Sequence, residues 1–231
     1  MYKYEMHLHS SGCSACAFSD SRDYVDAALE NGYSGMVFTN HFYHGNTEVS
    51  RRLPWKDFVG AFRDDWLKAK EYGDEKGIDV LFGIEEVYEP GSGKEILIYG
   101  ITPEDLIRCP EFQYMNVYQM SAFARNLGGY VVCAHPFRVR DYIPDPYTAP
   151  DPEFMDAVEI YNYFNSEEDN RKAVEFAELH RLPGISGGDI HKTCNFGHSG
   201  LAFYERIHTN EQLVDALKNG RYQLICNGVI G

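Results

Sequence analysis

The chain has 231 residues, enough for one domain with a large core, and its 44% hydrophobic content is typical of globular proteins. Its formal charge of −14, from 21 Lys and Arg against 35 Asp and Glu, argues against a nucleic-acid partner, because such partners require basic patches. No apolar run approaches the roughly 18–20 residues that cross a bilayer, and the first residues have no apolar signal-peptide core, so we expect a cytoplasmic protein without membrane contact.

Short β-like segments alternate with helical patterns along the whole chain. Gly or Pro follows each predicted helix, at Gly32, Gly77, Gly128 and Pro183. Strands that alternate with helices are typical of parallel β/α units, so we predict an α/β barrel that forms a single domain over residues 1–231. The predicted strands are 3–9, 35–39, 80–85, 95–99, 130–134, 157–161, 184–186, 201–207 and 222–225, and the predicted helices begin near 21, 55, 115 and 167.

One stretch departs from this alternation. Half of the ten prolines fall in residues 136–152, so we predict a long loop there. Long loops without secondary structure in compact enzymes often form lids or the walls of sites. The alternative is an ordinary surface loop with no role in a site.

Metal-binding residue types lie at or just after the carboxyl ends of several predicted strands. In parallel β/α barrels this is the end at which active sites are built. His7 and His9 project to the same face of their strand, so one cation could bind both imidazoles. A single histidine at the end of a strand is usually structural. Histidines or carboxylates at the ends of several strands are not expected by chance. The residues that share it are His7, His9, His41, Glu85, His135, Asp189 and His191.

These segments resemble the ordered motifs of the PHP (polymerase and histidinol phosphatase) family. The matching motifs are His7-Leu-His-Ser10, Thr39-Asn-His41, Gly83-Ile-Glu85, Ala134-His-Pro-Phe-Arg138 and Gly187-Gly-Asp-Ile-His191. Each motif is weak alone, but five in order with plausible spacing are specific. The resemblance spans residues 7 to about 202 and implies a distorted (β/α)7-type barrel with two or three divalent ions, Zn, Mn or Fe, at its mouth.

The resemblance also implies a role for each ligand. His7, His9, Glu85 and Asp189 would hold a first metal, with Glu85 bridging to a second that His135 also binds. A third metal would be held by His41 and His191. Closely spaced metals clamp phosphate oxygens and acidify a bridging water, so the implied reaction is attack on phosphorus by a metal-bridged hydroxide. Glu85, Asp189 and Arg138 are the predicted catalytic residues.

The sequence departs from the family pattern in three places. Asn40 replaces the acid of the usual Thr-Asp-His motif, which would affect the orientation of His41 more than its ligation. On the strand after Glu85, where many members have a histidine, either Glu95 or Leu97 aligns. Glu95 would supply a carboxylate, whereas Leu97 would leave the second metal one ligand short.

The third departure concerns Cys16. An alignment with a one-residue insertion puts Cys16 at a third-metal ligand position, where a thiolate favours zinc or iron. The alternatives are a small buried hydrophobic residue or, with Cys13, a redox motif. A redox motif would need the start of a helix after a strand, which is not evident here.

Three basic or polar residues are candidates for phosphate contact. Arg138, next to the His135-Pro136 motif, is suited to bidentate pairing with phosphate, with Arg140 as a second choice. His198 follows the last motif and could line the mouth of the barrel. We interpret His44, His180 and His208 as structural or surface residues.

The sequence therefore predicts a metal-dependent phosphoesterase that hydrolyses a phosphomonoester on a small molecule. A nuclease or phosphodiesterase is the first alternative, and a catalytically silent PHP-like module that binds metal or a partner is the second. The substitutions at Asn40 and around Glu95 motivate the second alternative. The oligomeric state and the substrate cannot be decided from the residues.

Overall fold

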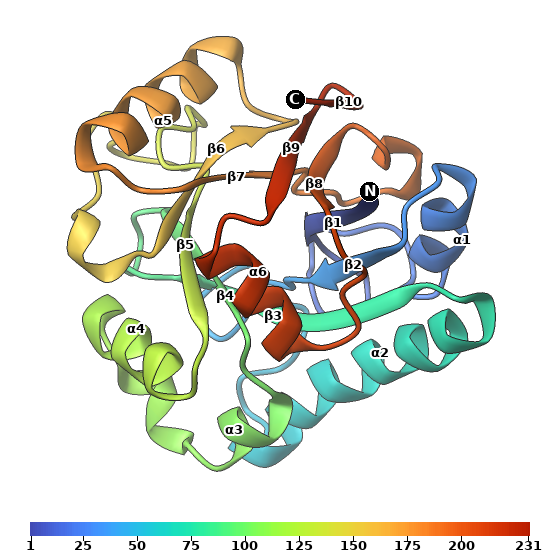
Figure 1. The fold of residues 1–231 in the computed structure, drawn as a ribbon. Coiled ribbons are helices and arrows are strands. Elements are labelled where there is room, and N and C mark those ends of the chain that lie inside the picture. Colours follow the sequence, from blue (N-terminus) through green and yellow to red (C-terminus); the bar gives the residue numbers. More distant parts are fainter.

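The strands of the protein form one mixed sheet that curls into an open, distorted barrel (Figure 1). We describe residues 1–231 from a computed structural model. The sheet has ten strands in the order β10-β9-β8-β1-β2-β3-β4-β5-β6-β7. Their bounds are β1 Tyr2–Leu8, β2 Gly35–Phe38, β3 Asp79–Val87, β4 Glu95–Tyr99, β5 Tyr130–Ala134, β6 Ala157–Asn162, β7 Gly184–Gly187, β8 Ser199–Phe203, β9 Tyr222–Cys226 and β10 Val229–Ile230.

The predicted distorted barrel is confirmed, but the strictly parallel β/α pattern is wrong in the middle of the chain. β1, β2 and β3 are parallel, as are β5, β6 and β7. β4 runs antiparallel to both of its neighbours, because a short turn rather than a helix joins it to β3. A parallel bridge between Leu8 and Ile190 brings the chain after β7 next to β1. β8 to β10 extend the other edge as antiparallel strands.

Most helices cover the outer side of the sheet, whereas the C-terminal helix packs against the side chains that face the inside of the barrel (Figure 1). The sequence explains where the predicted helices lie. Two predicted helices have the expected bounds, α2 at Trp55–Lys76 and α5 at Glu167–His180. α2 ends at Gly77, whose φ of 75° is a left-handed conformation that favours glycine. α1 (Asp23–Glu30) and α4 (Val117–Asn126) are shorter than predicted. Two short helices were not predicted, α3 at Pro103–Ile107 and α6 at Asn210–Lys218.

Side chains of the barrel strands alternate between an inner and an outer apolar cluster. On β4, Ile96 and Ile98 pack in the cluster that includes residues of α2, α4 and α5, whereas Leu97 and Tyr99 pack in a second cluster with Leu81 of β3. Glu95 lies on the same face as Leu97, because successive side chains of a strand alternate. The inner core therefore ends in a layer of polar residues at one mouth of the barrel.

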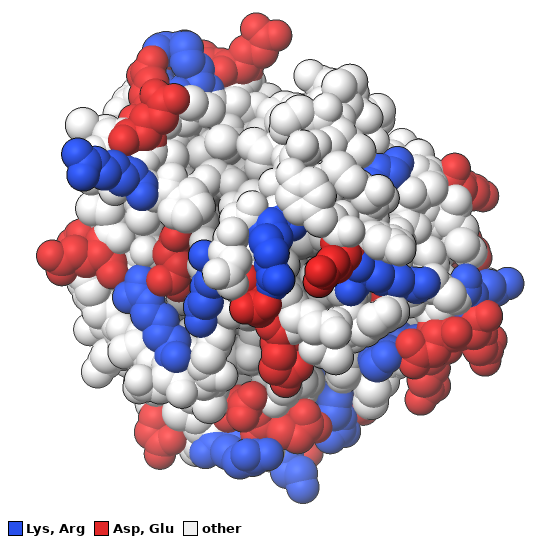
Figure 2. Space-filling model, in the orientation of Figure 1, with Lys and Arg blue, Asp and Glu red and all other residues white.

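On the face drawn in Figure 2, acidic and basic side chains are interspersed without a continuous basic stripe. None of the helices combines the length and the apolar character that a membrane span requires.

Candidate metal centre

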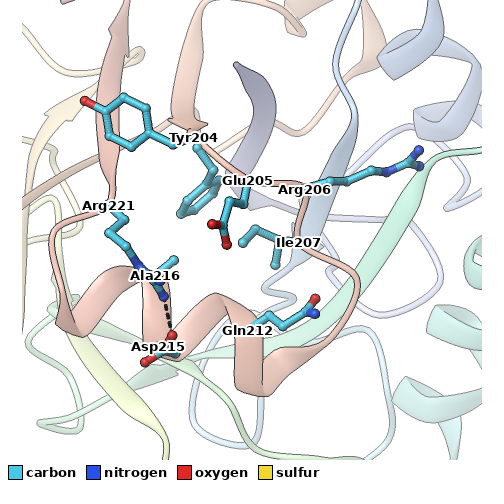
Figure 3. Close-up of a pocket in the computed structure, with 9 residues that line it drawn as sticks. Tyr204, Glu205, Arg206, Ile207, Gln212, Asp215, Ala216 and Arg221 are labelled. Carbon is cyan, nitrogen blue, oxygen red and sulfur yellow. Dashed lines mark hydrogen bonds and ion pairs between the residues drawn. The ribbon is translucent and has the colours of Figure 1, made fainter.

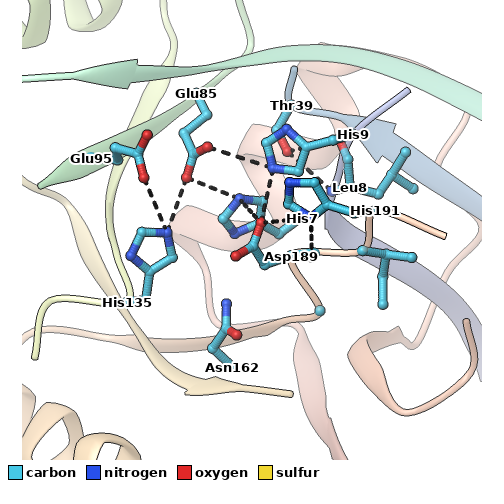
Figure 4. Close-up of polar contacts among 12 residues, drawn as sticks. His7, Leu8, His9, Thr39, Glu85, Glu95, His135, Asn162, Asp189 and His191 are labelled. Carbon is cyan, nitrogen blue, oxygen red and sulfur yellow. Dashed lines mark hydrogen bonds and ion pairs between the residues drawn. The ribbon is translucent and has the colours of Figure 1, made fainter. Parts of the chain in front are cut away.

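The seven predicted ligands converge at one mouth of the barrel, and Figure 4 draws six of them with Glu95. They come from segments that are far apart in the sequence, and each is on a strand or directly after one. β1 carries His7 and leads into His9, β2 leads to His41, β3 carries Glu85, β5 leads to His135, and β7 leads to Asp189 and His191.

Glu85 lies at the centre of the cluster and is fully buried. Its Oε1 is 3.0 Å from His7 Nε2 and 3.1 Å from His135 Nε2. Its Oε2 is 2.7 Å from His41 Nδ1. One carboxylate therefore faces three imidazoles from three different strands, which is the arrangement expected of a ligand that bridges two cations.

Asp189 faces the other side of the two β1 histidines. Its Oδ1 is 3.0 Å from His9 Nε2 and 3.5 Å from both His7 Nε2 and His191 Nδ1. Its other oxygen accepts a hydrogen bond from Arg138 Nη1 at 2.5 Å. Asp189 thus offers one oxygen to the histidines while an arginine holds the second.

Several buried polar atoms of this cluster have no hydrogen-bond partner, although they face one another at short distances. Most buried polar atoms in proteins are hydrogen-bonded, so a group of exceptions requires an explanation. A cation between them would satisfy all of them, and these donor types suit Zn, Mn or Fe. The unpartnered atoms are His7 Nε2, His9 Nε2, His41 Nδ1, Glu85 Oε2 and Asp189 Oδ1.

The residues present fit more than one ion. Four overlapping groups of three residues each place one ligand atom per residue within 4.8 Å of the others. The groups share His7, His9, His41 and Glu85 among them, so the sites would be adjacent. The groups are His7-His9-Asp189, His7-Glu85-His135, His41-Glu85-Glu95 and His9-His41-His191.

The charge environment keeps both central carboxylates ionised. Burial alone would raise the pKa of Glu85, but the positive charges of His7 and His41 hold that pKa well below its usual value. Burial likewise opposes ionisation of Asp189, and Arg138 with His7 holds its pKa well below the usual value. Ionised carboxylates are the form that binds cations.

Comparison with known proteins gives one partial family match and several structures with a similar fold. Residues 167–222 match the family PHP_C, described as PHP-associated. A two-domain protein from Bacteroides vulgatus that contains a predicted PHP-like metal-dependent phosphoesterase has a similar structure, with a TM-score of 0.68 and 16% identity over 99% of this chain. The chain shares the fold of that PHP-like protein. It covers 66% of the length of that two-domain protein.

Two further solved structures share the fold. One is a proposed metal-dependent phosphoesterase from Bifidobacterium adolescentis, with a TM-score of 0.56 and 15% identity over 93% of this chain and 95% of that chain. The other is an amidohydrolase from Chromobacterium violaceum with bound sulfate and no metal, with a TM-score of 0.56 and 16% identity over 82% of this chain and 87% of that one. No curated protein matches the sequence.

The backbone at two PHP motif residues is strained. His135 has a φ of 29° and Asp189 a φ of 53°, in the left-handed region that residues other than glycine rarely adopt. Such strain persists where the surrounding structure determines it, often at functional sites. The strain turns both side chains toward the cluster directly after β5 and β7.

Outer hydrogen bonds fix the orientation of two imidazoles. Glu159 Oε1 lies 2.9 Å from His7 Nδ1, so this nitrogen donates, and Nε2 is the nitrogen of His7 that faces the cluster. His191 Nδ1 donates in the same way to the backbone oxygen of Asp189 at 2.7 Å. Sequence reasoning assigned no role to Glu159, which is fully buried inside β6.

The sequence left open whether Glu95 or Leu97 lies at the site and whether Cys16 does. The structure distinguishes between these alternatives. Leu97 is fully buried in the inner core, whereas Glu95 faces the cluster, with Oε1 3.2 Å from His41 Nδ1 and Oε2 3.6 Å from His135 Nε2. Cys16 lies at the edge of the cluster, with Sγ 3.0 Å from His191 Nε2. Cys16 is only partly buried and is not in a disulfide.

The side chain of Arg138 is held by hydrogen bonds within the protein, which its sequence context did not suggest. Its Nε donates to Asn165, its Nη1 to Asp189 and its Nη2 to Asn162, and the side chain is buried. Arg138 also lines the cavity next to the cluster. The structure thus places it both as a support for Asp189 and within reach of a ligand in that cavity.

The other candidates differ in their distance from the cluster, and Arg140 lines a pocket that Asp189 and His191 also line. Arg140 is exposed and donates to the backbone oxygens of Val139 and Phe164. His198 stacks on Tyr163, with ring centroids 4.5 Å apart, and does not contact the candidate ligands. His208 pairs with Asp79 at the opposite end of β3.

A cavity of about 440 Å³ adjoins the cluster. Its walls include Cys16, His41, Glu95, Asp189 and His191. Arg138 and Tyr142 of the proline-rich segment also line it, so this predicted loop forms part of the wall of the site. A smaller pocket of about 120 Å³ lies far from these residues, between β8 and α6 (Figure 3).

Proposed function

We propose that this chain is a metal-dependent phosphoesterase that hydrolyses a phosphomonoester of a small molecule. The observation that carries the proposal is the group of unpartnered, buried imidazole and carboxylate atoms beside a 440 Å³ cavity. A cavity of this volume suits a small ligand. The charge of −14 disfavours a long nucleic-acid chain.

The residues of the chain would hold two or three divalent ions, Zn, Mn or Fe. Glu85 would bridge, with His7, His9 and Asp189 on one side and His135 with Glu95 on the other. His41, His191 and Cys16 would complete a third site. When bound, adjacent cations polarise phosphate oxygens and lower the pKa of a water toward neutrality.

The remaining side chains would orient these groups. Glu159 retains the proton on His7 Nδ1, which leaves Nε2 available as a ligand. Arg138 holds one oxygen of Asp189, and its remaining hydrogens at the cavity wall would contact a phosphate oxygen. The sulfate bound to the Chromobacterium amidohydrolase, a tetrahedral oxyanion like phosphate, is consistent with this substrate class.

The experiment uses the protein loaded with Mn²⁺ or Zn²⁺ and tested on p-nitrophenyl phosphate and on bis(p-nitrophenyl) phosphate. The proposal predicts faster turnover of the monoester and loss of activity with a chelator. Glu85→Gln should abolish the activity, and Asp79→Asn, which changes the carboxylate at the other end of β3, is the matched control.

The same assay distinguishes the two alternatives. Preference for the diester would favour a phosphodiesterase or nuclease. Metal binding without turnover of either ester would favour a silent module, for which Asn40 and Glu95 are the motivating substitutions. Absence of metal binding would contradict both enzyme functions and leave only a silent module that binds a partner.

A further inference from the structure

A second hollow lies directly beside the cavity of the candidate metal centre. Its volume is about 300 Å³, and it shares three wall residues, Arg138, Asp189 and His191, with the 440 Å³ cavity. A ligand in the first cavity can therefore extend past Asp189 and His191 into this outer pocket. The other residues of the wall of the outer pocket are Arg140, Phe164, Lys192 and Asn195.

The wall of the outer pocket is cationic, although the chain as a whole has a charge of −14. Arg138, Arg140 and Lys192 contribute positive charges, and Asp189 is the only carboxylate among the wall residues. Asp189 pairs with Arg138. Arg140 donates to two backbone oxygens and Lys192 lies over an aromatic ring, so neither charge is neutralised by a carboxylate. An anion in the pocket would meet two cations that lack an anionic partner.

Arg140 is held in place by the backbone. Its Nη1 donates to Val139 O at 2.8 Å, and its Nη2 donates to Phe164 O at 2.7 Å. A guanidinium group has more hydrogens than these two contacts use, so others remain for a ligand. Because the side chain is already ordered, less conformational entropy is lost when an anion binds to it.

Lys192 directly follows the candidate ligand His191. The backbone oxygen of His191 accepts a hydrogen bond from Phe18 N at 2.9 Å, which holds Phe18 beside Lys192. Lys192 Nζ lies 4.2 Å from the centre of the Phe18 ring, a distance typical of a cation–π contact. Lys192 itself is exposed, so its ammonium group stays accessible to an anion.

We propose that the substrate carries a second anionic group, a carboxylate or a second phosphate, which Arg140 and Lys192 bind while the phosphomonoester lies at the cluster. The inference rests on the proposed function and narrows its substrate class. Arg140 and Lys192 line the outer pocket and not the 440 Å³ cavity, so their ligand is a group other than the phosphate at the cluster. Phe164, whose side chain is partly exposed, offers an apolar wall to the carbon chain between the two anionic ends.

The test uses flexible substrates that differ in one end only. An n-alkyl phosphate is compared with the phosphate ester of the corresponding ω-hydroxy carboxylic acid and with the α,ω-diol bisphosphate, over a series of chain lengths. The rate of phosphate release is measured with the Mn²⁺-loaded protein. At the best length, an ester with a second anionic end should have a kcat/KM about 10-fold or more above that of the alkyl phosphate, mainly through KM, because hydrogen bonds to charged groups contribute at least this factor. The better of the two anionic esters identifies the second group as carboxylate or phosphate.

The variant that tests the two cations combines Arg140→Ala with Lys192→Ala. It should raise KM for the anionic esters and remove most of the preference for them. Arg221→Ala combined with Lys218→Ala is the matched control, because it changes the net charge equally at the end of α6 and just after it, and neither residue lines the outer pocket. The control should retain the preference. High salt should reduce the preference of the wild type, because the two cations are exposed.

Three results would overturn the inference and leave the proposed function intact. They are turnover without a preference for either anionic ester at any chain length, a preference that survives in the Arg140→Ala, Lys192→Ala variant, and an equal loss of preference in the control. A metal-loaded wild type that releases phosphate from none of the esters would overturn the proposed function and this inference together.

Discussion

Strand β3 carries a carboxylate near each end, and the two differ in how their oxygens are satisfied. Asp79, at the start of β3, accepts from Tyr4 Oη and from Arg206 Nε, both at 2.7 Å, and lies 2.8 Å from His208 Nδ1. Glu85, near the other end, faces three imidazoles, yet one of its oxygens has no hydrogen-bond partner. Both carboxylates are surrounded by cationic or titratable groups, but only Glu85 has an oxygen without a hydrogen-bond partner.

This difference separates a structural ion pair from a candidate ligand set. The polar atoms around Asp79 satisfy one another, so the group needs nothing further. The atoms around Glu85 satisfy one another poorly, which is the arrangement expected around a bound cation. Charge and histidine content alone would not distinguish the two ends of the strand.

The largest expected effect comes from Glu85→Gln, which retains the shape of the side chain and removes its charge. Turnover of p-nitrophenyl phosphate should fall more than about 100-fold, because even outer partners of metal ligands cost 10–100-fold. Glu85 gives a cleaner test than Asp189, whose loss would also leave Arg138 buried without its carboxylate partner. Wild-type turnover in this variant would remove Glu85 from the site.

Glu159→Gln should have the second-largest effect. A glutamine that presents its amide group to His7 Nδ1 would favour the other tautomer of His7 and weaken metal binding by about 10–100-fold. Isothermal titration with Mn²⁺ or Zn²⁺ measures the change. If the affinity were unchanged, the buried contact between Glu159 and His7 would serve stability only.

Asp79→Asn should lower the stability of the protein without affecting its activity. Loss of a charged acceptor should lower the free energy of unfolding by about 1–3 kcal/mol, measured by urea denaturation, with activity unchanged. Arg206 and His208, both partly or largely exposed, would remain solvated. Loss of activity without loss of stability would show that the comparison between the two ends of β3 is wrong.

The smallest expected effect concerns the thiol of Cys16. Burial alone would raise the pKa of Cys16, but hydrogen bonds with His191 and His41 lower it to about 6. The measurement is the rate of alkylation by iodoacetamide in metal-free protein, from which the rate of the Cys16→Ser variant is subtracted. This difference should rise with pH, with a midpoint near pH 6, below the ordinary thiol pKa of about 8.5.

The lowered pKa of Cys16 also makes the stability of the fold depend on pH. Because the pKa of Cys16 is lowered in the folded state, its contribution to stability is fully present above the unfolded pKa of about 8.5. It is lost as the pH falls through about 6. The stability of the wild type relative to Cys16→Ser should decrease over that interval, and a constant difference would contradict the lowered pKa.

The sequence predicted the convergence of the candidate ligands that follow a parallel strand. His7, His9, His41, Glu85, His135, Asp189 and His191 converge as expected, because the carboxyl ends of parallel strands share one edge of a sheet. Glu95 could not be chosen over Leu97 in this way. β4 is antiparallel, so its first residue, paired with Val87 and Ala134, is the one that lies at the mouth.

The role of the supporting residue Glu159 could not be predicted from the sequence. Glu159 lies inside a strand whose other residues are apolar or neutral. Its role depends on the tertiary contact with His7. In contrast, α6 had a readable start, since Thr209 caps it by accepting from Gln212 N, and more attention to capping would have found it.

The most direct test of the account is the number of metal ions bound per chain at saturating Zn²⁺, measured by elemental analysis after removal of free ions. The account predicts two or three ions for the wild type and for Asp79→Asn, and fewer for Glu85→Gln. A wild type that retains no ion, or a Glu85→Gln variant that retains as many as the wild type, would contradict the claim that the unpartnered atoms around Glu85 form a metal centre.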